Sequence, residues 1–172
     1  SAPDMAVTLF GRRFDAPFAV APIGLAGLLW PGCEMPIAIA ARRHNVPHVL
    51  STFSNRSLEA IRPVVGENGW FQFYPPNDLA MEADMLTRAE KAGYRTLVLT
   101  VDIPAPTRRE RDIRNGLSVP PKLDLSTMIQ IATHPAWALH VLRHGIPEFE
   151  NLSPYYPKGA SLAASAEFVG RV

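Results

Sequence analysis

The 172-residue sequence contains a single cysteine, Cys33, so it can form no disulfide within the chain and no cluster of thiolate metal ligands. A chain without disulfides is typical of a reducing compartment, and we therefore expect a cytoplasmic location. The five histidines have no metal-ligand spacing with one another or with other ligand residues, so we expect them to be structural or to lie at the surface, and we expect no metal site.

Strong charge of either sign is also missing. Lys and Arg together number 17 and Asp and Glu 16, which gives a net charge of +1. This balance gives no reason to expect nucleic acid as a partner. No apolar run approaches the ~20 residues of a membrane-spanning helix, and the first residues, SAPDMAVTLF, do not have the pattern of a secretory signal. The 47% of hydrophobic residues instead predict a globular fold.

Four short runs of apolar residues predict β-strands, at residues 18–24, 48–52, 70–74 and 96–102. These runs barely alternate with polar residues, which is typical of parallel strands that are covered on both faces. Segments with helical patterns follow the first three runs, at residues 34–44, 58–65 and 78–92. Strand and helix thus alternate, and this order predicts consecutive βα units in an α/β fold with a parallel sheet.

The flanking regions follow a different pattern. Residues 7–14 predict a short hairpin before the first strand. After the fourth strand, residues 115–158 form a long connection with helix-like stretches at 125–132 and 135–144. We expect residues 159–172 to begin one more helix. The sequence contains no GxGxxG dinucleotide fingerprint, no phosphate-binding P-loop and no HExxH motif.

Polar side chains gather where two neighbouring strands are predicted to end. Gln72 and Tyr74 share one face of their strand, and Thr100 and Asp102 share one face of the next. Ligands of α/β folds bind at this end of the sheet. Strand propensity also explains Thr100, and a turn also explains Asp102. Gln72 is harder to explain, because a buried amide without partners costs roughly 1–3 kcal/mol.

Four stretches together resemble the FMN-dependent α-hydroxy-acid dehydrogenases and oxidases: APIGLAGLLWPG, LSTFSNRSLE, WFQFY and LVLTVDIPAPTRRERD. This family includes L-lactate dehydrogenase, mandelate dehydrogenase and glycolate oxidase. GLLWPG is most similar to the mandelate dehydrogenase version, and THPAWALHVLRHGIPEFENL to the L-lactate dehydrogenase loop. The resemblance implies a TIM (β/α)8 barrel. Residues 7–114 would be its first half, about four βα units, followed by the long loop.

The resemblance also implies the roles of individual residues. FMN would be contacted by the backbone of Pro22, Ile23 and Gly24 and by the side chains of Ser51, Gln72 and Thr100. Tyr74 and Arg109 would meet the substrate, a small 2-hydroxy acid. Asp102, together with Tyr74, would be catalytic, because a carboxylate beside a histidine base stabilises the imidazolium that forms. Arginine suits a substrate carboxylate because its planar fork donates two hydrogen bonds.

The family's histidine base, flavin-contacting lysine, carboxylate-binding arginine and FMN phosphate site have no counterpart in these 172 residues. We therefore expect a fragment of a longer homo-oligomeric enzyme, tetrameric as in the family, that binds FMN weakly by itself and does not turn over. The alternatives are a non-catalytic half barrel and another FMN-barrel enzyme. The sequence leaves open which hydroxy acid is oxidised and whether oxygen or a quinone accepts the electrons, although Gly24 favours a dehydrogenase.

The long connection is mixed apolar and basic, and bacterial dehydrogenases of this family use the same loop to dock on membranes. One expectation is therefore that residues 115–158 contact the inner face of the plasma membrane peripherally. The alternative is that they pack on the barrel or on another subunit.

Overall fold

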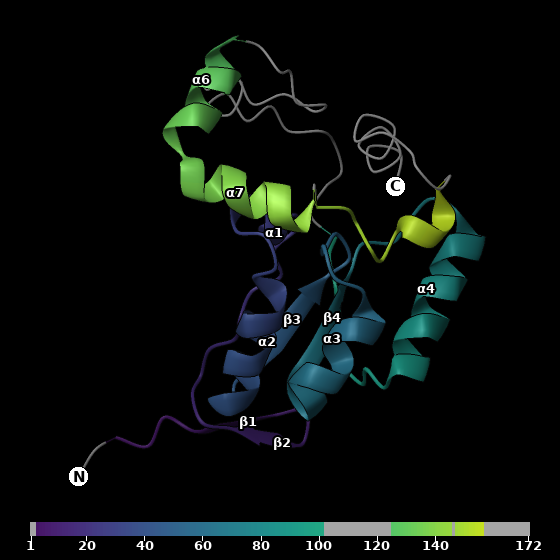
Figure 1. Ribbon diagram of the computed structural model, residues 1–172. Coiled ribbons are helices and arrows are strands. Elements are labelled where there is room, and N and C mark those ends of the chain that lie inside the picture. Colours follow the sequence, from purple (N-terminus) through teal and green to yellow (C-terminus); the bar gives the residue numbers. More distant parts are fainter. Residues whose placement is uncertain (1–2, 102–124, 146, 157–172) are drawn as a thin grey trace.

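The computed structural model describes residues 3–101, 125–145 and 147–156 (Figure 1). Asp102 and Arg109 lie outside the described residues, as does the segment 159–172. The roles expected for these two side chains and the helix expected in that segment stay predictions.

The described chain contains five strands: β1 (Val7–Leu9), β2 (Arg12–Phe14), β3 (His48–Ser51), β4 (Gly69–Phe73) and β5 (Leu97–Leu99). Its helices are α1 (Ala26–Leu29), α2 (Glu34–Arg43), α3 (Leu58–Val65), α4 (Leu79–Ala92), α6 (Leu125–Thr133) and α7 (Pro135–His144), with 3-10 turns at Gly66–Asn68 and Ser153–Tyr155. The hairpin, three of the four predicted strands and the five helices predicted within the described residues are present within a few residues of their expected bounds. Helix α1 was not predicted.

The main sheet is parallel, with β4 between β3 and β5. Val20 extends it past β3 by an isolated parallel bridge to His48, through hydrogen bonds from Val20 N to Pro47 O and from Val49 N to Val20 O. The strand predicted at residues 18–24 is therefore reduced to one bridge. A proline provides no N–H for the ladder, and Pro22 lies two residues beyond Val20. The order along the sheet nevertheless follows the chain, as consecutive βα units require.

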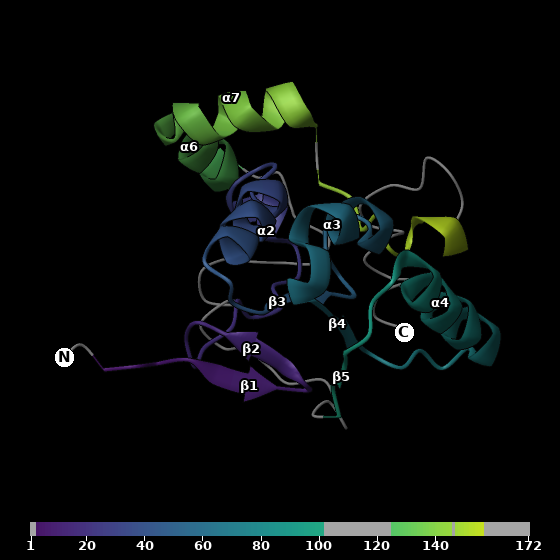
Figure 2. The ribbon, with the colours of Figure 1, turned by 90° about the horizontal axis from the view of Figure 1, so that it is seen from below.

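Helices α2, α3 and α4 cover one face of this sheet (Figures 1 and 2). Phe71 and Phe73 of β4 point to this face and are fully buried against apolar side chains of α3 and α4. Two helices start with a side-chain cap, since Ser57 Oγ accepts a hydrogen bond from Ala60 N and Asp78 Oδ1 accepts one from Ala80 N. This layer fixes the orientation of the strands that carry the site.

The opposite face of β4 holds the alternate residues, Trp70 and Gln72. The ring of Trp70 packs edge-on against Phe10 and Phe14, at centroid distances of 5.4 and 6.0 Å. The β1–β2 hairpin thus closes the amino end of the strand, as its place at the foot of the sheet in Figure 1 shows. The carboxyl end is where Gln72 lies.

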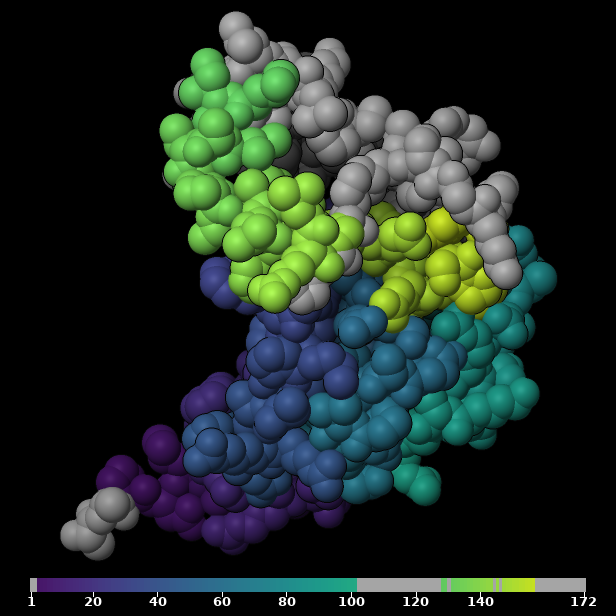
Figure 3. Space-filling model, in the orientation of Figure 1, coloured from purple at the N-terminus to yellow at the C-terminus, as the bar shows by residue number. Residues whose placement is uncertain are grey.

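The long connection contains two different parts. Helices α6 and α7 stand beyond the carboxyl end of the sheet (green in Figure 3). Helix α7 contacts α1 and the residue that follows it. Trp137 Nε1 donates a hydrogen bond of 2.8 Å to Leu28 O, and the ring centroids of His140 and Trp30 lie 4.9 Å apart. Residues 147–156, which we call the return segment, then come back to the body. Phe149 and Leu152 of the return segment are buried in the main core.

Candidate functional site

The side-chain amide of Gln72 joins three adjacent strand ends. Its Oε1 accepts hydrogen bonds from Ser51 Oγ at 3.1 Å and from Thr52 N at 3.3 Å. Its Nε2 donates to Thr100 Oγ1 at 2.7 Å. The structure therefore places Ser51, Gln72 and Thr100, three residues named from the sequence, in one connected cluster, which we call the glutamine cluster.

The strand register explains this convergence. In the parallel ladder, Ser51 is the partner of Gln72, and Gln72 is the partner of Val98. Thr100 lies two residues beyond Val98 and so falls on the same face, where its main-chain N–H donates to Phe73 O at 3.0 Å. Period-two alternation alone is enough to bring these side chains together once the strands are paired.

Burial of Gln72, which is only 2% exposed, does not by itself require a ligand. Its oxygen and one N–H group have partners within the protein, so a flavin is no longer needed to satisfy most of this buried amide. The hydrogen bonds among the described residues use one of its two N–H groups. The amide is thus held in a fixed orientation with one donor left for a ligand.

Thr52, which the sequence analysis did not name as a site residue, fixes the ends of two strands. It is fully buried; its Oγ1 donates to Gln72 O at 2.7 Å and accepts from Tyr74 N at 3.1 Å. A Ser-Thr pair at the end of a strand is the only sequence signal for this role, and strand propensity explains it equally well.

Pro22, Ile23 and Gly24 form an exposed stretch of backbone beside the glutamine cluster. A Cβ atom added to Gly24 would lie 3.2 Å from Phe53 Cβ and 3.9 Å from Ser51 Oγ. Leu25 N donates to Phe53 O at 3.1 Å and anchors the end of the stretch. The lack of a side chain at Gly24 lets Phe53 pack closely against this stretch, whose main chain stays exposed on its other side.

Tyr74 follows Gln72 on the same face and is half-buried. The ring of Tyr74 packs against the ring of Phe53 at a centroid distance of 5.2 Å and an interplanar angle of 35°. Phe53 also packs against Phe149 of the return segment. The aromatic contact orients the ring of Tyr74 next to the stretch that ends at Gly24.

Asn151 is a further residue that sequence reasoning missed. It is fully buried; its Nδ2 donates to Ser51 O at 3.1 Å and its Oδ1 accepts from Leu58 N at 2.7 Å. The neighbouring Glu150 accepts from Ser57 N at 2.8 Å. The return segment therefore holds both the end of β3 and the start of α3. An Asn in a loop rich in Pro and Ser reads as a turn residue, and no sequence signal separates the two roles.

The groups with shifted pKa values lie away from the glutamine cluster. Burial lowers the pKa of His48, at the amino end of β3, and its Nδ1 has no hydrogen-bond partner among the described residues. Burial and a hydrogen bond to Asp84 raise the pKa of Tyr155 to about 12. The pKa shift of His48 results from the packing of β3, and that of Tyr155 from the packing of the return segment.

The described residues contain neither a cluster of metal ligands nor a membrane-spanning helix. No three side chains of His, Cys, Asp or Glu come together there in a way that could hold a metal ion. No described helix is both long enough and apolar enough to cross a bilayer.

Comparisons with known proteins point to one family. The model of the FMN-dependent dehydrogenases matches residues 1–171. The crystal structure of (S)-mandelate dehydrogenase, a monotopic membrane protein, is similar with a TM-score of 0.88 and 33% identity, over 98% of this chain and 44% of that one. Mandelate oxidase with benzoyl-formic acid gives a TM-score of 0.62 and 43% identity, over 66% and 34% of the two chains. The chain thus spans less than half the length of these structures.

Proposed function

The chain belongs to the FMN-dependent dehydrogenase family, and we propose that the protein that carries it oxidises an L-2-hydroxy acid of the mandelate type to the 2-oxo acid. The observation that carries this proposal is the glutamine cluster beside the open backbone of residues 22–24. The substrate class is supported by the similarity to mandelate dehydrogenase and by mandelate oxidases solved with benzoyl-formic acid and (S)-2-phenylpropionate.

The described residues fit the ring of FMN. A planar isoalloxazine needs a surface that it can approach closely, which the exposed backbone of the stretch ending at Gly24 would offer, and donors and acceptors at its polar edge. The remaining N–H of Gln72 and the hydroxyls of Ser51 and Thr100 would supply those hydrogen bonds. As the resemblance implies, the phosphate would be held by later strands of the barrel.

The proposed chemistry assigns this chain's other site residues to the substrate. Oxidation of a hydroxy acid removes a proton and two electrons, and FMN accepts the electrons when it is bound. The Tyr74 hydroxyl would donate a hydrogen bond to the substrate, and Arg109 would bind its carboxylate. The carboxylate of Asp102 would hold a histidine of a later strand and stabilise its protonated form. The roles of Arg109 and Asp102 are proposed on the family resemblance.

We further propose that these residues form the first half of a (β/α)8 barrel. Near the end of the described part of the fourth strand region, Leu99 and Val101 have exposed apolar side chains. A neighbouring strand and its helix would cover side chains of this kind. The 172 residues alone are then expected to bind FMN weakly and not to turn over. FMN absorbance that stays with the purified chain through gel filtration would contradict this.

A peripheral membrane contact is proposed for the surface formed by α1 and α7. Leu29 is the last residue of α1 and Trp30 follows it, Leu139 and Leu142 lie on α7, and all four side chains are exposed. Residues 125–144 contain no Asp or Glu, and Arg143 is exposed, which suits anionic lipid. The contact between α7 and α1 joins both parts into one apolar surface, and similarity to a monotopic relative supports it.

The substrate proposal is tested by flavin reduction in a complete protein that contains this chain. Without oxygen, the flavin absorbance should bleach on addition of (S)-mandelate, and faster than on addition of L-lactate. The R-enantiomer is the matched control and should leave the spectrum unchanged. Failure of every 2-hydroxy acid to bleach the flavin would overturn the proposal.

A further inference from the structure

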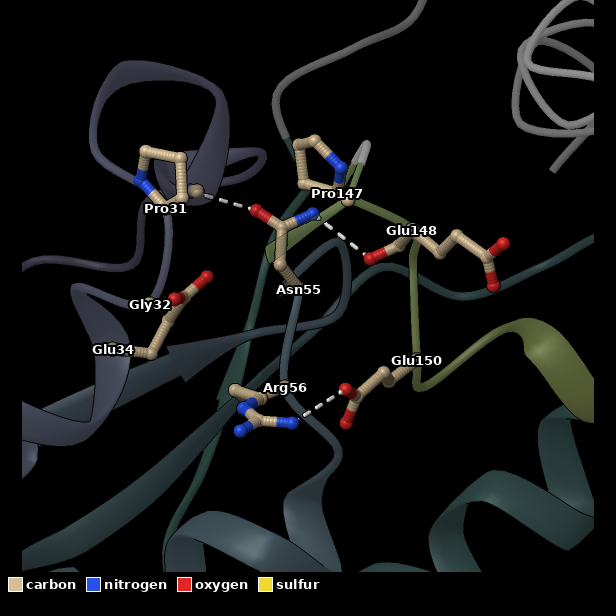
Figure 4. A pocket seen from close by; sticks show the side chains of 10 residues that line it. Pro31, Gly32, Glu34, Asn55, Arg56, Pro147, Glu148 and Glu150 are labelled. Carbon is tan, nitrogen blue, oxygen red and sulfur yellow. Dashed lines mark hydrogen bonds and ion pairs between the residues drawn. The ribbon is translucent and has the colours of Figure 1, made fainter. Parts of the chain in front are cut away.

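A pocket of about 550 Å³ lies between three segments that are distant in the sequence (Figure 4). They are the stretch from Gly27 to Glu34, the pair Asn55 and Arg56, and a third group made of Gly145 and three residues of the return segment, Pro147, Glu148 and Glu150. The residues that line this pocket include none of those assigned above to flavin or substrate. Its volume falls within the ~300–1,000 Å³ of typical small-molecule sites.

Side-chain hydrogen bonds fix the walls of this pocket. Asn55 Oδ1 accepts from Gly27 N at 2.8 Å, and Asn55 Nδ2 donates to Glu148 O at 2.9 Å, so one amide joins all three segments. A Cβ atom on Gly27 would lie only 2.9 Å from Asn55 Oδ1. Arg56 pairs with Glu150 at 3.0 Å. The pocket is therefore held open by specific contacts and is not a gap between loose loops.

The charges around the pocket do not balance. Three of the residues that line it are acidic, Glu34, Glu148 and Glu150, and one is basic, Arg56. Since Arg56 pairs with Glu150, no cation in the lining is left for the other two carboxylates.

Glu34 is the most unusual of these groups. Its residue is 6% exposed, its Oε1 has no hydrogen-bond partner among the described residues, and its Oε2 has only a contact of 3.8 Å with Cys33 Sγ. Figure 4 shows its carboxylate directed into the pocket. A place in the first turn of α2 favours an acidic residue. It does not explain why an oxygen removed from water has no donor, which is costly for a carboxylate.

We propose that this pocket binds an organic cation, with a guanidinium or primary ammonium group against the carboxylate of Glu34. A bound water would donate a hydrogen bond but would leave the charge unbalanced. A metal ion would need several ligands, and the described residues offer no group of three His, Cys, Asp or Glu that could hold one. A guanidinium group supplies both charge and paired N–H donors in the plane that a carboxylate prefers.

The test is an NMR titration of the 172-residue chain with methylguanidinium, with propylammonium and with neutral methylurea. Both cations should shift the amide signals of Gly27, Gly32 and Gly145, and methylurea should not. Glu34→Gln should weaken cation binding by about tenfold or more, because a buried charge loses its partner. Glu34→Asp, which keeps the charge, should retain part of the affinity. Glu90→Gln, on the exposed side of α4, is the matched control and should bind like wild type.

A second arm identifies the source of the cation. A short peptide with one central arginine is titrated beside the free cations. Binding of the peptide alone would indicate a side chain of a protein partner, and preference for the free cation a small molecule. Equal binding of methylurea, unchanged affinity in a folded Glu34→Gln variant, or no response of the folded wild-type chain to either cation or to the peptide would each overturn the proposal.

Discussion

The amide of Asn151 donates a hydrogen bond of 3.1 Å to the main-chain oxygen of Ser51, across 100 residues of sequence. Ser51 in turn donates from its hydroxyl to Gln72. The return segment and the glutamine cluster are thus linked by consecutive hydrogen bonds through buried groups. A segment that follows a long connection therefore helps to set the position of the strand end on which the proposed flavin site depends.

Replacing Asn151 by alanine should lower the free energy of unfolding of this chain by about 2–4 kcal/mol, because Leu58 N and Ser51 O lose a buried partner. Urea unfolding followed by circular dichroism measures the change. Asn151→Asp keeps an acceptor for Leu58 N and should cost less than alanine. Equal stability of Asn151→Ala and wild type would show that water replaces the side chain at no cost.

Gln72→Leu should destabilise the chain by about 1–3 kcal/mol, because the hydroxyls of Ser51 and Thr100 lose their common partner. Thr100→Val removes one hydrogen bond from the same cluster and should cost less. Thermal unfolding of the three proteins gives the order. If Thr100→Val were the more damaging change, Gln72 would not be the centre of the cluster.

Acid should destabilise the chain through His48. Burial depresses the pKa of this imidazole in the folded state, so below about pH 6.5 the unfolded chain binds a proton that the folded chain resists. Stability is therefore lost as the pH falls from 7.5 to 5. His48→Phe should lose less stability over the same interval, measured by urea unfolding at both values. Parallel losses in the two proteins would contradict the assignment.

Asp102→Asn, in a complete protein that contains this chain, should slow anaerobic flavin reduction by at least ~100-fold, because the proposed histidine base loses its negative partner. Binding of FMN should be retained, since Asp102 is not assigned to the cofactor. Stopped-flow single-turnover measurements separate the two effects. An unchanged rate of reduction would exclude the role proposed for this carboxylate.

The membrane proposal predicts that Trp30→Glu and Leu142→Glu each reduce co-sedimentation with anionic vesicles. Each substitution places a charge on the α1–α7 surface, where it would have to be desolvated in the interface. Leu79→Glu is the matched control, because Leu79 is 77% exposed on α4, outside that surface. Loss of binding in Leu79→Glu to the same extent, or no binding of wild type, would contradict the proposal.

The elements set by local sequence were predicted well. The caps at Ser57 and Asp78 depend on residues next in the chain, and the glycine that ends α4, Gly93, has the positive φ of 95° that the helix end requires. The first strand was wrong in extent because the apolar pattern of residues 18–24 outweighed Pro22, which provides no ladder donor. An apolar pattern predicts that a segment is buried, but the pairing of strands also needs main-chain N–H donors.

For the site, the sequence predicted only the strand face on which each side chain lies. Gln72 and Thr100 were placed on matching faces because strand side chains repeat every two residues. Their direct contact depends on the pairing register, which the sequence does not state. Asn151 was missed because its partners lie far away in the chain, and a buried capping asparagine has the same sequence context as an exposed turn asparagine.

The position of the flavin ring is tested most directly by a crystal structure of a complete protein that contains this chain, with FMN bound. We predict that the isoalloxazine lies against the backbone of residues 22–24, with the Gln72 amide within hydrogen-bond distance of the ring. A flavin bound elsewhere in the fold, with the Gln72 amide out of reach of the ring, would contradict the proposed site.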